Sequence, residues 1–137
     1  MEVRRQKNLV LILAREFASK LATATFVADA DGTLVFYNEP AEELLGQSFA
    51  ETGEVPMDEF ALRFHMEESE GTPMAPTSRP GRTALNEQRA VHRNFRITTL
   101  DGVKREISST AFPLFSRPDE CVGIMSIFWE RQNNNQG

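Results

Sequence analysis

The part of the sequence that decides the fold is Thr25 to Asn38, which reads TFVADADGTLVFYN. Two short runs rich in β-branched and aromatic residues, 25–28 and 33–37, flank the polar segment Asp29-Ala30-Asp31-Gly32. Glycine readily adopts a positive φ, and aspartate side chains bond to nearby backbone amides, so this segment predicts a tight turn. The stretch therefore predicts a β-hairpin.

A short helix is predicted directly after the hairpin. Asn38 is a favourable N-cap residue, and Pro40 is tolerated in the first turn. Glu42 and Glu43 lie near the positive end of the helix dipole, and Gly46 can end the helix. The whole unit of strand, turn, strand and capped helix is thus specified by local sequence.

Length and charge restrict the class of protein. A chain of 137 residues forms one domain, too small for a sensor joined to a catalytic domain. The formal net charge of −5 argues against nucleic acid or an anionic membrane as the main partner. Cys121 is the single cysteine, which excludes an internal disulfide and a thiolate zinc cluster.

Residues 1–20 do not read as a signal peptide. The most apolar run, Leu9 to Ala14, is six residues long, whereas a membrane-spanning helix needs roughly 20. We therefore expect a cytoplasmic protein with no transmembrane segment.

Residues 2–22 contain neither glycine nor proline and predict an amphipathic helix. The main apolar stripe consists of Val10, Leu13, Ala14, Phe17 and Leu21, while Leu9 and Ile12 lie on the opposite side. Two interpretations stay open: the helix packs only on its own domain, or it is buried between this domain and a second copy or output partner. The second predicts a dimer interface made of Leu9, Val10, Ile12, Leu13 and Phe17.

The rest of the chain alternates between predicted helices, strands and loops. We expect a loop over 47–56, a helix from Met57 to Phe64, an irregular connection over 71–80 and a helix over 81–88. Strands are expected over 91–97, 104–114 and 121–129, the first two joined at Asp101-Gly102, and a polar tail over 132–137. His65 is expected at the end of its helix as a surface residue.

This order of elements resembles a PAS domain from about Phe17 to Arg131. The residues that carry the resemblance are Asp29, Asp31, Gly32, Asn38, Ala41, Glu42, Leu44, Leu45 and Gly46, then Gly71-Thr72-Pro73, Ala84-Leu85, Asp101-Gly102, Pro113-Leu114 and Val122-Gly123. The resemblance implies an α+β fold: a five-stranded antiparallel sheet with short helices on one face and the N-terminal amphipathic helix on the other. It divides the chain into a dimerisation helix (1–22), the PAS domain (23–131) and the tail (132–137), with a non-enzymatic sensory or regulatory role.

In such a fold, alternate residues of each strand face a cavity between sheet and helices. On the late strands we assign Phe95, Ile97, Ile107, Ser109, Ala111, Gly123, Met125 and Ile127 to the cavity. With residues from other elements, the predicted pocket consists of Phe36, Phe60, Phe64, Leu85, Arg93, Phe95, Ile97, Ile107, Ser109, Met125 and Ile127. The opposite face of the last strand, Val122, Ile124 and Phe128, would then be covered by Phe17 and Leu21.

Arg93 shares strand parity with Phe95 and Ile97, so it could reach the cavity mouth and pair with an acid head group. The implied ligand is a small apolar molecule with one carboxylate, such as a fatty acid. The alternative is a solvated arginine at a fraying strand end.

We do not expect this chain to bind the flavin or haem cofactors that some PAS domains carry. The flavin thiol motif N-C-R-F-L-Q is absent, and Ile97, Ile107 and Met125 stand where flavin-binding relatives place amides. Residues 81–88 contain no axial histidine, so haem would need His65 or His92 in a shifted register. No catalytic or metal-ligand constellation is apparent.

Two hypotheses remain. The domain is either a small-molecule sensor, or a ligand-free dimerisation and docking module whose cavity is filled by Phe36, Phe60, Phe64, Phe95 and Met125. The sequence names neither a ligand nor an output protein.

Overall fold

The computed structural model describes residues 2–131, with side chains from residue 9 onward, and the predicted tail 132–137 lies outside the described residues. The helices are α1 (Glu2–Ser19), α2 (Glu39–Leu45), α3 (Phe49–Thr52), α4 (Met57–Leu62) and α5 (Pro80–Glu87), with a 3-10 turn, η1 (Pro76–Ser78). The strands are β1 (Thr25–Asp29), β2 (Thr33–Tyr37), β3 (Val55–Pro56), β4 (Val91–Thr98), β5 (Lys104–Arg117) and β6 (Glu120–Glu130).

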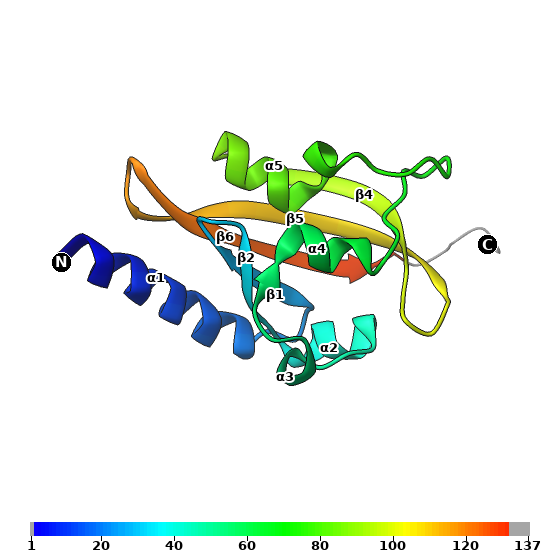
Figure 1. Cartoon of the computed structure of the whole chain (residues 1–137), viewed down its shortest axis with the longest axis horizontal. Helices are drawn as coiled ribbons and strands as arrows, with labels where there is room; N and C mark the ends of the chain where they lie inside the picture. Colours follow the sequence, from blue (N-terminus) through cyan, green and yellow to red (C-terminus); the bar gives the residue numbers. More distant parts are fainter. Residues whose placement is uncertain (1, 132–137) are drawn as a thin grey trace.

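The strands form one antiparallel sheet in the order β3-β2-β1-β6-β5-β4. Helices α4 and α5 lie on one side of this sheet, and α1 lies on the other (Figure 1). The predicted α+β fold is confirmed, with six strands instead of five. The extra strand, β3, pairs with β2 through only two residue pairs, Thr33 with Pro56 and Leu34 with Val55.

The first hairpin and its capped helix form as predicted. Gly32 has a φ of 86°, and the carboxylate of Asp29 accepts hydrogen bonds of 3.0 Å from the backbone amides of Asp31 and Thr33. Gly46 ends α2 in the left-handed region at a φ of 88°. These local signals decide the structure because each bond joins residues only a few positions apart.

The expected loop over 47–56 is wrong in part, because it contains α3 and β3. Ser48 and Glu51 form a capping box at the start of α3, in which each side chain bonds to the other residue's backbone amide. This Ser-x-x-Glu pattern is a recognised start signal that outweighs the polar composition of the segment. Helix α4 ends at Leu62, so the exposed His65 lies beyond it, with a φ of 47°.

The apolar core is split into two layers by the sheet. The larger layer lies under α2, α4 and α5, and the smaller joins α1 to β1, β2, β5 and β6. In the smaller layer, Ala14 and Ala18 of α1 pack near Val27 and Met125.

The helix face that meets the sheet differs from the predicted one. Ala14 and Ala18 are 7% and 0% exposed, whereas Phe17 is 57% exposed and does not cover the sheet. Leu13 is exposed to the same extent as Phe17, and Leu21 is half-buried. The prediction is wrong because it favoured large side chains, while the small alanines let the helix backbone approach the sheet closely.

The orientation of β6 is also opposite to the prediction. Ile124 and Phe128 belong to the layer under α4 and α5, whereas Met125 and Ile127 belong to the layer under α1. Both sets are apolar because this central strand is covered on both faces, so composition alone could not orient it.

Candidate ligand-binding cavity

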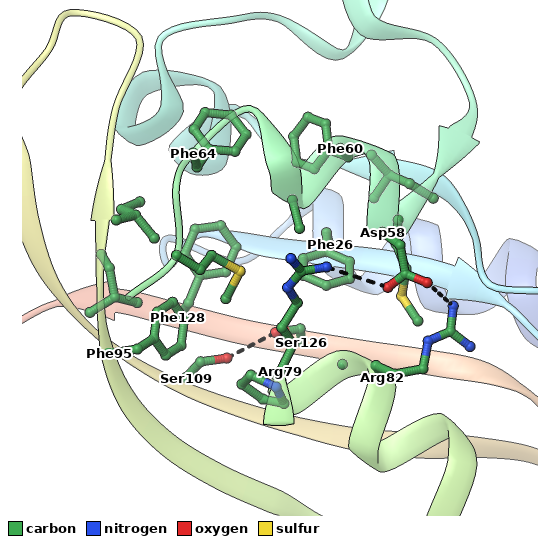
Figure 2. A pocket seen from close by; sticks show the side chains of 18 of the residues that line it. Phe26, Asp58, Phe60, Phe64, Arg79, Arg82, Phe95, Ser109, Ser126 and Phe128 are labelled. Atoms are coloured by element: carbon green, nitrogen blue, oxygen red, sulfur yellow. Dashed lines mark hydrogen bonds and ion pairs between the residues drawn. The ribbon is translucent and has the colours of Figure 1, made fainter. Parts of the chain in front are cut away.

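A cavity of about 100 Å³ lies between the sheet and helices α4 and α5. Aromatic side chains surround it from the sheet and from the α4 segment, as Figure 2 shows. They are Phe26 on β1, Phe60 on α4, Phe64 just after α4, Phe95 on β4 and Phe128 on β6. The remaining lining is mostly aliphatic, so the cavity suits an apolar group.

Two hydroxyl groups form the uncharged polar part of the cavity wall. Ser109 on β5 and Ser126 on β6 are each 2% exposed, and their Oγ atoms lie 3.1 Å apart (Figure 2). They hydrogen-bond each other, which partly offsets the cost of burying a polar group.

Charged residues gather at another part of the lining. Asp58 lies in the first turn of α4. Arg79 occupies the N-cap position of α5, and Arg82 lies one turn further along α5. The carboxylate of Asp58 lies between the two guanidinium groups: Oδ2 is 2.8 Å from Nη2 of Arg82, and Oδ1 is 3.7 Å from Nη1 of Arg79 (Figure 2). Asp58 therefore connects the two helices that border the cavity.

Arg79 is the more deeply buried arginine of this pair. Its side chain is 11% exposed, against 23% for Arg82. The Nε atom of Arg79 is buried without a hydrogen-bond partner among the described residues. Among the described residues, its one ion pair is the long one to Asp58.

Six of the residues predicted for the pocket line the cavity: Phe60, Phe64, Phe95, Ile97, Ile107 and Ser109. Phe36, Met125 and Ile127 do not, because they lie on the α1 side of the sheet. Leu85 packs against the larger core layer without lining the cavity.

Arg93 also does not reach the cavity. Its guanidinium donates to the carboxylate of Glu68 at 2.7 Å and to the carbonyl of Ser78 at 3.1 Å. The cationic residues of the lining are instead Arg79 and Arg82, which sequence reasoning missed. The available signal was the run Arg79-Pro80-Gly81-Arg82, where proline marks a helix start and places both arginines at its N-terminus.

The geometry defines a class of protein: an α+β domain with a small apolar cavity between its curved sheet and its short helices. The family described as PAS fold matches residues 19–136, and the chain belongs to this family. None of the curated proteins matches the chain.

Solved structures show the same fold at low sequence identity. The PAS domain of a Colwellia psychrerythraea protein is 17% identical, with a TM-score of 0.61, covering 89% of this chain and 97% of that one. The PAS domain of BvgS from Bordetella pertussis is 11% identical, with a TM-score of 0.63 and coverage of 92% and 89%. A Rhodobacter sphaeroides LOV protein is 15% identical, with a TM-score of 0.68 and coverage of 94% and 69%.

The cavity volume limits what it can hold in this conformation. Drug-sized ligands occupy pockets of about 300–1,000 Å³, whereas an apolar cavity of about 150 Å³ accommodates benzene. At about 100 Å³ and partly open, the cavity can hold an apolar group no larger than one aromatic ring. A flavin, a haem or a long fatty-acid chain would require the cavity to expand.

Within residues 2–131, no helix is long and apolar enough to cross a membrane. The same part of the chain contains no group of three or more His, Cys, Asp or Glu residues placed to hold a metal ion.

Proposed function

We propose that this chain is a cytoplasmic, non-catalytic sensory domain that binds a small, mainly apolar ligand and signals through a dimeric α1. The PAS fold is a sensory and regulatory family, which gives the general class. The observation that carries the ligand proposal is the partly open, aromatic-lined cavity between the sheet and helices α4 and α5.

Strands β1 and β6 offer a direct route from the cavity to α1. Phe26 lines the cavity, and its neighbour Val27 packs in the layer under α1. On β6, Ser126 lines the cavity, and the adjacent Met125 belongs to the α1 layer. A ligand that shifts either strand therefore changes the surface on which α1 rests.

The outer side of α1 supports the proposed dimer. Leu9, Ile12, Leu13 and Phe17 are 53%, 53%, 57% and 57% exposed, so all four lie on the outer side of the helix, away from the buried Ala14 and Ala18. The expectation that Leu9 and Ile12 lie on the side opposite Leu13 and Phe17 is therefore wrong. A continuous exposed stripe of large apolar side chains is typical of an interaction surface. We call these four residues the α1 stripe.

We assign the α1 stripe to a second copy of this chain. An open groove beside it is lined by Ile12, Arg15, Glu16, Ser19 and Phe36. Arg15 and Glu16 bring opposite charges to this groove, so a two-fold axis could pair Arg15 of each copy with Glu16 of the other. Self-complementary charge beside an apolar stripe suits an isologous dimer.

Native mass spectrometry tests the ligand proposal. The folded protein, purified without added ligand, is compared with its denatured mass, and a retained ligand appears as extra mass. If the ligand exchanges freely, titration of the folded protein with toluene, an apolar probe of suitable size, should show binding by ligand-observed NMR. If the protein shows neither retained mass nor toluene binding, the sensor function is ruled out.

The second candidate function is a ligand-free dimerisation and docking module. The small cavity volume favours it, and the rings of Tyr37, Phe60 and Phe64 pack against one another beside this space. This module would dimerise through the α1 stripe but would bind no toluene, so the same titration separates the two functions.

A further inference from the structure

We propose that the ligand is a compact acid, whose carboxylate binds Arg79 and Arg82 in place of Asp58 while its apolar body occupies the cavity. This inference rests on the proposed sensor function. It assigns a chemical class to the ligand and a switching role to the ion pairs at the cavity.

The first argument is the environment of Arg79. Its side chain is 11% exposed and lines an apolar cavity, yet its Nε has no hydrogen-bond partner among the described residues. A buried guanidinium normally needs close, hydrogen-bonded partners, and its planar fork matches a carboxylate. The long 3.7 Å ion pair to Asp58 leaves this capacity unused.

The second argument is the position of Asp58. Its side chain is 46% exposed, and it belongs to the six-residue helix α4. Asp58 already places a carboxylate between the two arginines (Figure 2), so the structure shows that this charge and shape are accepted there. Because Asp58 is partly exposed, it can be displaced into water at low cost.

The third argument is the start of helix α5. Arg79 at the N-cap makes no side-chain cap bond to the first turn, and the buried Gly81 lines the cavity. Helix N-termini favour negative charge through their exposed amides and dipole. The arginines and the helix end therefore present positive potential to the same side of the cavity.

Displacement of Asp58 would alter how α4 meets α5. In this structure, Asp58 joins the two helices through both of its carboxylate oxygens. An acid bound to the arginines would release α4 while its apolar body contacts Phe60 from the same helix. The ion pairs between the ligand and the two arginines would thus replace those that Asp58 makes.

Isothermal titration of the full chain with benzoate and with toluene tests the proposal, because the two share an aromatic ring and differ in the carboxylate. We expect benzoate to bind at least about tenfold more tightly than toluene. Arg79→Gln should remove this preference without weakening toluene binding. Asp58→Asn should strengthen benzoate binding several-fold, because it removes the internal competitor.

Arg89→Gln is the matched control, because the exposed Arg89 pairs with Glu87 at the far end of α5 and its loss should leave the preference intact. Circular dichroism checks each variant for folding; if Arg79→Gln does not fold, Arg82→Gln replaces it. Benzoate binding no tighter than toluene would overturn the acid proposal and leave the apolar sensor standing. Failure of both probes to bind the wild-type protein would overturn the acid proposal and the sensor together.

Discussion

The side-chain amide of Asn38 donates a hydrogen bond of 2.9 Å to the backbone carbonyl of Ala18, near the end of α1. A second bond, also 2.9 Å, goes to the carbonyl of Thr23. The carboxamide oxygen accepts from the amides of Thr25 at 3.0 Å and Ala41 at 3.1 Å. With all four hydrogen-bonding positions filled, this buried side chain joins α1 to the first strand and to α2.

Asn38→Ala should lower the free energy of unfolding by at least about 2 kcal/mol, because it removes a helix cap and leaves buried backbone groups unpaired. Urea denaturation measures this effect. Asn38→Ser is the matched variant, since serine can still cap α2 but is too short to bond to Ala18. Serine should therefore recover part of the stability, while α1 still exchanges its amide protons faster than in the wild type. Wild-type stability for Asn38→Ala would contradict the role of this residue.

Gly32→Ala should destabilise the protein by more than about 1 kcal/mol, because alanine resists a positive φ. A Cβ at this position would also lie 2.8 Å from Nη2 of Arg82. Gly102→Ala is the matched control, with a φ of 81° and no atom within 4 Å of the added Cβ. The melting temperature should fall further for Gly32→Ala than for Gly102→Ala, and equal losses would exclude the contact with Arg82.

The hairpin glycines, the Asn38 cap and the element order were predictable because residues close in sequence decide them. The face of α1 was not, because packing selected the small Ala18 over the large Phe17. The orientation of β6, whose Met125 lies under α1, was not predictable either, because both faces of the strand are buried and apolar.

The charged part of the candidate site was not predictable for a different reason. Arg93 has the strand parity of the cavity, yet Glu68, 25 residues earlier, binds its guanidinium. Asp58 and Arg82 likewise meet across 24 residues. Such pairs depend on how loops and helices are placed in space, and local sequence patterns do not predict that placement.

Tyr37 should make the protein less stable at alkaline pH. Burial raises the pKa of its hydroxyl above the usual value, partly opposed by the hydrogen bond with Thr52. The unfolded chain therefore loses this proton first, so the contribution to stability is complete below about pH 10 and is lost as pH rises through the folded pKa. Because Tyr37 is the only tyrosine, phenolate absorbance reports its titration directly. A midpoint at or below pH 10 in the folded protein would contradict this prediction.

Phe17→Ala should change the stability of the folded protomer by no more than about 0.5 kcal/mol, because the ring is exposed. Ala18→Leu should cost about 1–3 kcal/mol by overpacking the contact with the sheet. Thermal unfolding at a concentration where the protein is monomeric separates the two. A larger loss for Phe17→Ala than for Ala18→Leu would mean that α1 presents its other face to the sheet.

The double change Leu9→Glu, Ile12→Glu should leave the fold intact and weaken self-association, because it places unpaired charge on the α1 stripe. Leu13→Glu with Phe17→Glu should act in the same way. Sedimentation velocity measures the dimer affinity, with circular dichroism as the check on folding. A monomeric wild-type protein, or variants that dimerise as tightly as the wild type, would rule out this interface.

Hydrogen–deuterium exchange with and without toluene tests most directly whether the cavity communicates with α1. Gly81→Val serves as a blocked control, because a Cβ at this position would lie 3.3 Å from Phe26 and 3.7 Å from Met57, two residues of the cavity lining. A sensor that signals through α1 should show slower exchange in residues 14–19 when toluene is bound, and no change in the blocked variant. Protection confined to α4, α5 and the strands, with α1 unchanged at saturating toluene, would contradict signalling through this helix.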